Sequence, residues 1–333
     1  MFAHKINPRW VLAAVLAFGL ALPLVRAENT GVAAPASQAT DLAIAEVFKL
    51  AEKEEKNLTF LEVVVAVSKV YDHDLDAMRL GRKLDQFAES VKQAVAQAPD
   101  ARGKIAAINQ VLYVDQGFKS DPALGSDPLS GEGTLDASLL HRVVERKTGI
   151  CLGLATVYLV VCERANLPVY PVHAPNHIFC RWDDGASKFN IECTARGMIQ
   201  SDRQIAQTTH ATKAGMTQSP YFRKGTKKEV LSDQLNNLTY DLAMRKKGPA
   251  PFTWAQLVKL GDLAAKLQPR SAEVLDTAAC IQLRAGNPVR ALAYSDQLVP
   301  LAREYGTMPE VLVEFEKRHK EYEAAVQKQK VAR

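Results

Sequence analysis

Apolar residues recur at helical spacing through the first third of the chain. Four stretches carry an apolar side chain every three or four residues: 42–51, 61–70, 84–95 and 105–113. This period is typical of α-helices that bury one face. We therefore predict an all-helical preamble over residues 41–115.

The middle of the chain changes pattern twice. Residues 117–135 are rich in Gly, Ser, Pro and Asp, which predicts a long loop, and loops of this length tend to border functional sites. A short helix is predicted over residues 136–146. Residues 151–165 are apolar nearly all round, which predicts a buried central helix that ends at Asn166-Leu167-Pro168.

Three short β-prone runs follow this helix, at residues 169–174, 177–182 and 187–193. Asp184-Gly185 matches a two-residue type I′ hairpin turn, which would pair residues whose numbers sum to 369. His177 would then lie directly opposite Glu192, at a Cβ separation of about 4.5–5.5 Å. The same register places the like charges of Arg181 and Lys188 opposite each other.

This register also sorts the hairpin side chains into two faces. The face predicted to join the core carries Ile178, Cys180, Trp182, Phe189 and Ile191. The other face carries His177, Phe179, Arg181, Lys188, Asn190 and Glu192.

The last part of the chain is again helical. Residues 207–228 are predicted to form a polar loop, 229–246 a helix, and 253–330 two helix pairs. Gly286-Asn287-Pro288 separates helices at 272–285 and 288–304. We interpret residues 41–226 as one domain, with its core at 136–205, and residues 227–333 as a helical tail.

The N-terminus has the order of a secretory signal. Lys5 and Arg9 precede an apolar run over residues 10–25, and Val25-Arg26-Ala27 offers a small-residue cleavage site after Ala27. We expect residues 1–27 to be removed, residues 28–40 to form a flexible leader, and the protein to be periplasmic or secreted. The alternative is an uncleaved membrane anchor; after cleavage no stable membrane insertion is expected.

The net charge and the cysteine spacing limit which partners and which metal sites are expected. Removing Lys5, Arg9 and Arg26 with the signal lowers the formal net charge from +5 to +2, which argues against a nucleic-acid partner. The five cysteines show neither C-x-x-C nor zinc-site spacing, and their odd number leaves one thiol free. The other four cysteines could form disulfides, and the sequence does not assign their pairing. No metal, nucleotide or flavin motif is present, so no cofactor is predicted.

Cys151, His177 and Glu192 are the candidate catalytic residues. A thiolate at a helix start is stabilised by the helix N-terminus, a histidine would take its proton, and a carboxylate would orient the imidazole. The backbone N–H of Cys151 would serve as an oxyanion donor.

Each of these residues also has a structural interpretation. Cys151 would be a small buried residue, His177 would bind a loop carbonyl, and Glu192 would be a solvated strand carboxylate. His173 is a competing base without a carboxylate at a predictable offset, and His141 is interpreted as a surface histidine that could border the site. The remaining cysteines are expected in the core: Cys162, Cys180, Cys193 and Cys280.

Several short motifs together resemble the transglutaminase-like superfamily, whose members have a papain-like core. They are Asn109-Gln110-Val111-Leu112-Tyr113 with Gly117-Phe118, Val144 to Gly149 with Cys151, Ala155, Arg164 and Leu167-Pro168, Pro175 to Phe179, and Asn190-Ile191-Glu192. The resemblance spans about residues 60 to 205. It is closer to the bacterial SirB-type branch, in which tetratricopeptide helices usually follow the domain.

The resemblance implies an α+β fold: a helical N-terminal layer, a papain-like core with a small antiparallel sheet, and a tetratricopeptide-like tail. By position, the family's cysteine, histidine and acidic residue fall on Cys151, His177 and Glu192. Two departures matter: the acidic residue is commonly Asp, and many SirB-type members have proline where this chain has Cys151.

Two functions follow from the resemblance. The first is an exported cysteine-dependent amide hydrolase or acyltransferase (peptidase, amidase, deamidase or transglutaminase) that acts on a protein or peptide. The second is a non-catalytic adaptor that binds a protein partner. The tail, in which Gly286, Ala291 and Leu292 are placed roughly as in tetratricopeptide repeats, would either bind a partner or act as a lid that completes the core.

Overall fold

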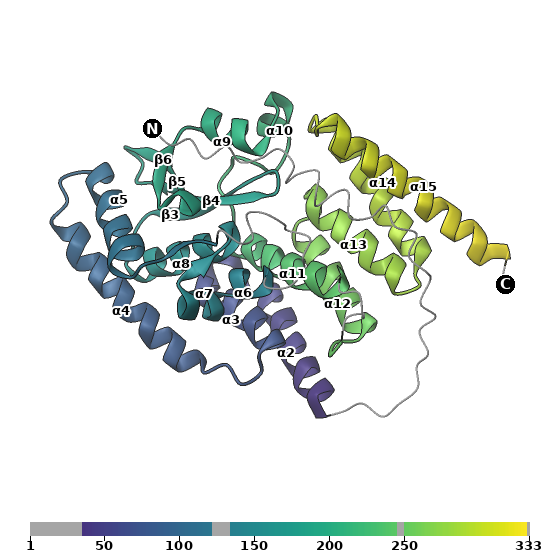
Figure 1. Ribbon diagram of the computed structural model, residues 1–333, viewed down its shortest axis with the longest axis horizontal. Helices are drawn as coiled ribbons and strands as arrows, with labels where there is room; N and C mark the ends of the chain where they lie inside the picture. Colours follow the sequence, from purple (N-terminus) through teal and green to yellow (C-terminus); the bar gives the residue numbers. More distant parts are fainter. Residues whose placement is uncertain (1–34, 122–133, 245–249, 332–333) are drawn as a thin grey trace.

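The computed structural model describes residues 35–121, 134–244 and 250–331. The predicted signal sequence (residues 1–27), most of the predicted leader, and residues 122–133 of the predicted long loop lie outside the described residues. Within them the fold is α+β, with many helices around one small antiparallel sheet (Figure 1). None of the described helices combines the length and the apolar character needed to cross a membrane.

The predicted helical preamble is confirmed. It consists of α2 (Pro35–Glu52), α3 (Phe60–Tyr71), α4 (Ala77–Ala96) and α5 (Ala101–Asn109). Thr59 begins α3 with a capping box, in which its side chain and that of Glu62 each bind the other's backbone N–H. Helix α2 begins six residues before residue 41, so the end of the predicted leader is helical.

Helix α8 (Cys151–Arg164) is the buried central helix that the apolar run predicts. Every side chain from Leu152 to Cys162 is buried. The helix packs against α3, α4 and strand β4, so it lies between the helical layer and the sheet. Ahead of it, the predicted helix 136–146 forms as two short helices, α6 (Thr134–Ser138) and α7 (Leu140–Arg146).

The main sheet has four antiparallel strands in the order β3 (Val169–Ala174), β4 (His177–Asp183), β5 (Lys188–Glu192) and β6 (Met198–Gln200). The first three strands match the predicted runs, and the fourth was not predicted. A separate parallel pair joins β1 (Lys119–Ser120) to β2 (Thr148–Gly149), directly before Cys151. The start of the long loop therefore pairs with the segment that leads to the cysteine.

The predicted hairpin register is wrong by two residues. Cys180 pairs with Ile191 and Asp183 with Lys188, so paired numbers sum to 371. The turn is longer than predicted because the Asp184 carboxylate accepts hydrogen bonds from the N–H groups of Ala186 and Ser187, at 3.0 and 2.7 Å.

A two-residue shift keeps every side chain on its predicted face, because side chains alternate with period two. Ile178, Cys180, Trp182 and Ile191 join the main apolar core. The shift also removes the predicted clash of like charges: Arg181 lies opposite Asn190, and Lys188 forms an ion pair of 3.0 Å with Asp183.

The opposite face of the sheet is covered as well. A second apolar cluster contains Val172, Phe179, Ile205, Tyr221 and Phe222. Part of it comes from α9 (Asp202–Thr209), and α10 (Lys213–Gln218) follows. Sequence patterning assigned residues 207–228 to a polar loop; they include the end of α9 and all of α10.

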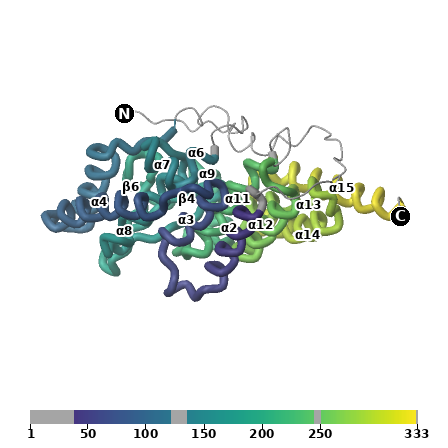
Figure 2. The backbone as a smooth tube through the Cα atoms, turned by 90° about the horizontal axis from the view of Figure 1, so that it is seen from below, coloured from purple at the N-terminus to yellow at the C-terminus, as the bar shows by residue number. Residues whose placement is uncertain are grey.

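The tail is helical, as predicted. It comprises α11 (Lys227–Met244), α12 (Trp254–Leu267), α13 (Ala272–Arg284), α14 (Pro288–Glu304) and α15 (Pro309–Val331). Both views place α4 at one end of the molecule and α15 at the other, with α11 between them (Figures 1 and 2). Helix α11 packs against α3, α12 and α13, and one apolar core runs from Ile44 to Phe315.

Candidate active site

Cys151 is the first residue of α8, and two local features fix this start. The N–H of Ile150, the residue before the helix, donates to the carbonyl of Ala137 at 2.9 Å. Gly153 packs against the same carbonyl so closely that a Cβ atom on it would lie 2.3 Å from the oxygen. The absence of a side chain at residue 153 therefore lets the helix start lie against α6 and α7.

His177 and Glu192 are in direct contact. His177 Nε2 lies 2.7 Å from Glu192 Oε2, although the register does not place the two residues opposite each other. Continued by one residue, that register puts Glu192 opposite Phe179, so the histidine reaches it along a diagonal of one sheet face. The side chains are 16% and 10% exposed, so the contact is largely shielded from water.

The second carboxylate oxygen of Glu192 also accepts hydrogen bonds. Oε1 accepts hydrogen bonds from the backbone N–H and the hydroxyl of Thr194, at 3.0 and 2.6 Å. The carboxylate is thus held from two sides, which fixes the direction in which it meets the imidazole. Thr194 had no distinguishing signal in the sequence.

The Cys151 thiol also acts on this imidazole, because it is one of the groups that raise the pKa of His177. Because Nε2 faces Glu192, Nδ1 is the ring nitrogen that does not contact this carboxylate. The ring of Phe179 stacks on the imidazole, with centroids 6.4 Å apart and planes inclined by 22°. The structure thus brings His177 and Glu192 into direct contact, and the Cys151 thiol acts on the same imidazole.

The electrostatics of His177 and Glu192 favour the charged form of both side chains. Burial lowers the pKa of His177, but the Glu192 carboxylate and the Cys151 thiol outweigh it, so the pKa of His177 lies well above its ordinary value of 6.5. Burial raises the pKa of Glu192, and the imidazole and Thr194 more than offset that effect, so the pKa of Glu192 is lowered. The imidazole is therefore held as a cation next to the Glu192 carboxylate.

Residues 79–236 match the family model of the transglutaminase-like superfamily. The chain therefore carries a transglutaminase-like domain. The matched residues contain Cys151, His177 and Glu192 together with α4 to α10 and most of α11. Assignment to the SirB-type branch stays a prediction.

Curated relatives match shorter parts of the chain. F-box only protein 21 of Mus musculus is 34% identical over 86 residues, which are 26% of this chain and 13% of the relative. A UPF0162 protein of Pasteurella multocida is 25% identical over 107 residues, which are 32% of this chain and 38% of the relative. The chain thus matches less than two fifths of the length of either relative.

A second histidine–carboxylate pair joins the sheet to the tail. His173 Nε2 lies 2.7 Å from Asp233 Oδ2, which belongs to α11 of the tail. Burial lowers the pKa of His173, but Asp233 outweighs it and the pKa is raised. This partner could not be predicted from the sequence, because Asp233 lies 60 residues away in the chain. The contact between His173 and Asp233 thus connects strand β3 to helix α11.

His141 is not the surface histidine that the sequence suggested. It is buried, and its Nε2 lies 3.3 Å from Asp72 Oδ2. Burial is the main reason why its pKa is lowered. The amphipathic pattern did not reveal this because α7 is covered on the side that carries His141.

The other four cysteines lie in the core, as predicted, and all five thiols are free. Cys180 and Cys193 lie side by side with their sulfurs 3.7 Å apart. Only Cys151 among the five is partly exposed. Among the described residues, no group of three or more His, Cys, Asp or Glu side chains is arranged to hold a metal ion.

Proposed function

We propose that this protein is a cysteine-dependent amide hydrolase or acyltransferase in which Cys151 is the nucleophile, His177 the base and Glu192 the residue that orients the imidazole. The observation that carries the proposal is the 2.7 Å contact between His177 and Glu192, supported by the Cys151 thiol, which helps to raise the pKa of His177. The membership of residues 79–236 in a superfamily with cysteine-based catalysis supports it.

The proposed reaction assigns one step to each of Cys151 and His177. The Cys151 sulfur, as a thiolate, attacks the carbonyl carbon of an amide while the His177 imidazolium holds the proton. His177 then gives this proton to the nitrogen of the leaving amine as the C–N bond breaks, which leaves a thioester on Cys151. Water or a second amine then attacks the thioester carbonyl and gives its proton to His177, and the C–S bond breaks, which releases the acyl product and restores the Cys151 thiolate.

Two further groups have roles in this proposal. The backbone N–H of Cys151 stands at the N-terminus of α8, where helical N–H groups lack intrahelical acceptors, and would stabilise the oxyanion. The Glu192 carboxylate would stabilise the imidazolium throughout. Its extra methylene relative to the common Asp is accommodated by the diagonal placement of Glu192 relative to His177.

Thiol labelling tests the proposal without knowledge of the substrate. Because four of the five cysteines are buried, the folded protein should take up one iodoacetamide label, on Cys151. We expect fast labelling at pH 6, where an ordinary thiol with a pKa of about 8.5 reacts slowly. His177→Ala should reduce the rate at pH 6 by about tenfold or more.

His173→Ala is the matched control. This histidine is also buried on the same sheet and also has a carboxylate 2.7 Å away, but its partner is Asp233. Its removal should leave the labelling rate unchanged. Equal rates in the wild type, His177→Ala and His173→Ala would overturn the enzymatic proposal and favour the adaptor function. Activity profiling on amide libraries, with Cys151→Ala alongside, then identifies the substrate class.

Export is part of the proposal and rests on the order of residues 1–27. N-terminal sequencing of the protein from its native host should begin at Glu28. A chain that retains Met1 and sediments with membranes would support the uncleaved anchor.

A further inference from the structure

The turn that precedes His177 is short and has an unusual backbone. Ala174 pairs with His177 across β3 and β4, so Pro175 and Asn176 form the whole connection. Asn176 has a φ of 51°, in the left-handed region, which asparagine adopts more readily than most residues. Because Asn176 is bonded directly to His177, any movement of this turn moves the first residue of β4 as well.

A carboxylate from the tail holds this turn. Glu273 Oε1, in the first turn of α13, accepts a hydrogen bond from the backbone N–H of Asn176 at 3.1 Å. The two residues are 97 positions apart in the chain. This is a direct link between the tail and the residue that precedes the proposed base.

Glu273 is itself fixed by two hydroxyl groups. Oε1 also accepts from Tyr221 at 2.7 Å, and Oε2 accepts from Ser271 at 3.0 Å. Tyr221 is buried, and burial and the Glu273 carboxylate both raise its pKa, so its hydroxyl stays a donor. The carboxylate therefore has little freedom to leave the turn.

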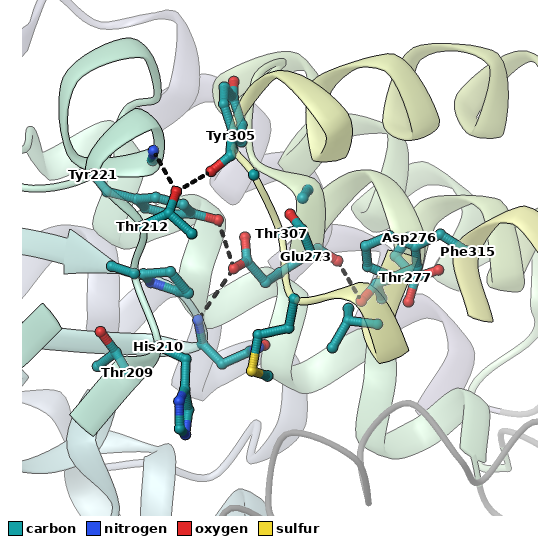
Figure 3. Close-up of a pocket in the computed structure, with 18 of the residues that line it drawn as sticks. Thr209, His210, Thr212, Tyr221, Glu273, Asp276, Thr277, Tyr305, Thr307 and Phe315 are labelled. Carbon is teal, nitrogen blue, oxygen red and sulfur yellow. Dashed lines mark hydrogen bonds between the residues drawn. The ribbon is translucent and has the colours of Figure 1, made fainter. Parts of the chain in front are cut away.

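The hydrogen bond between Glu273 and Asn176 lies at the edge of a cleft. A cleft of about 220 Å³ lies between the sheet and the tail, lined by Pro175 and Asn176 on one side and by Glu273, Asp276 and Thr277 of α13 on another. Figure 3 shows Tyr221 and Glu273 pointing toward each other in this cleft. One side of the turn thus borders the cleft. The hydrogen bond from Asn176 to Glu273 connects the turn to the tail at this edge.

We propose that Glu273 is a positioning residue for His177, so that the helical tail forms part of the active site. This inference rests on the function proposed above. By fixing the Asn176 backbone, Glu273 fixes the start of β4 and hence the distance from the imidazole to the Cys151 sulfur. Misplacement of a reacting group by about 1 Å can cost about a hundredfold in rate.

The test uses the full-length protein and the rate of Cys151 alkylation by iodoacetamide between pH 5 and pH 9. In Glu273→Ala the turn loses its acceptor, and we expect a rate about tenfold lower at pH 6, with the pH profile moving toward that of an ordinary thiol. Glu273→Gln keeps an acceptor oxygen and removes only the charge, so it should stay within about twofold of the wild type.

A tail carboxylate away from the turn serves as the control. Glu304 forms an ion pair of 2.7 Å with Arg270 on the tail surface. Glu304→Ala should leave the pH profile unchanged. A loss of thermal stability in Glu273→Ala with an unchanged profile would show a purely structural role and overturn the proposal, as would a Glu273→Gln profile equal to that of Glu273→Ala.

A folding defect does not block the test. If Glu273→Ala does not fold, Tyr221→Phe removes one of the bonds that fix the carboxylate and should lower the rate at pH 6 by about twofold to fivefold. An unchanged Tyr221→Phe rate would then contradict the proposal. His177→Ala, measured in parallel, separates the two hypotheses: if it matches the wild type, the proposed function fails, whereas a slow His177→Ala with a fast Glu273→Ala rejects only the role of Glu273.

Discussion

The imidazole of His177 and the carboxylate of Glu192 meet at 2.7 Å across a diagonal of the sheet, and the two side chains are 16% and 10% exposed. Glu192 cannot turn away from this contact without giving up its bonds to Thr194. Its negative charge is the largest favourable influence on the protonated form of His177.

Glu192→Gln should therefore lower the pKa of His177. The amide keeps the shape of the side chain but removes the charge that raises this pKa. NMR titration of the imidazole Cε1–H resonances measures the change directly. The pKa of His173, which Asp233 raises, should stay constant and serves as an internal reference. An unchanged His177 titration would show that Glu192 does not control its charge.

The same pair predicts how stability depends on pH. The folded-state pKa of His177 is above its ordinary 6.5, so its contribution is fully present below pH 6.5 and is lost as the pH rises through the folded-state pKa. The pKa of Glu192 is below its ordinary 4.5, so its contribution is present above pH 4.5 and is lost as the pH falls through the folded-state value. The pair thus stabilises the fold most between pH 4.5 and 6.5.

Chemical denaturation of the wild type and Glu192→Gln checks this dependence. The difference in unfolding free energy between the two proteins should be largest near pH 5.5 and should shrink toward pH 9. A difference that grows with pH would contradict the assigned shifts.

Arg181 offers a test of the corrected hairpin register. It is buried, donates to Asn190 Oδ1 at 2.5 Å and to the Phe222 carbonyl at 3.0 Å, and pairs with Asp202 at 2.6 Å. Arg181→Met leaves the two buried acceptors, on Asn190 and Phe222, without this donor. At about 1–3 kcal/mol for each buried acceptor, we expect a loss of about 2–6 kcal/mol in unfolding free energy.

The control for this variant is Arg290→Met. Arg290 is 60% exposed, and its ion pair with Asp262 spans 3.3 Å, so its removal should cost no more than about 1 kcal/mol. Similar losses in the two variants would mean that Arg181 is not buried against Asn190, and the observed register would then be in doubt.

The hairpin shows how far sequence reasoning reaches. The alternation of residues 177–182 and 188–192 fixes which side chains share a face, and that is enough to place His177 and Glu192 together. It does not fix the register, because shifts of two residues leave the faces unchanged. The Asp184 side chain determines the register, because its hydrogen bonds to the N–H groups of Ala186 and Ser187 lengthen the turn.

Contacts between distant segments could not be predicted in this way. Asp233 binds His173 over 60 residues, and Glu273 binds the Asn176 backbone over 97. Neither carboxylate stands in a motif, and each reaches its partner because the tail folds back on the sheet. Helical periodicity predicted the helices of the tail but carries no information on which of their polar residues face the site.

Gly153 tests how the start of α8 is positioned. A Cβ atom at this residue would lie 2.3 Å from the Ala137 carbonyl oxygen and 2.7 Å from Val143 Cγ2, and the carbonyl belongs to backbone that also binds Ile150. Gly153→Ala must therefore push α8 away from α6 and α7. Overpacking of this kind typically costs about 1–3 kcal/mol in unfolding free energy, and here it should also slow Cys151 alkylation at pH 6.

Gly81→Ala is the matched control, because Gly81 is also inside a helix but a Cβ atom there would have no neighbour closer than 3.9 Å. Alanine favours helices over glycine by about 1 kcal/mol, so this variant should be as stable as the wild type or more stable. If Gly153→Ala also gained stability and alkylated at the wild-type rate, the close packing against Ala137 would not be what positions Cys151. The two glycines thus separate the intrinsic preference of the helix from the packing that places the sulfur beside His177.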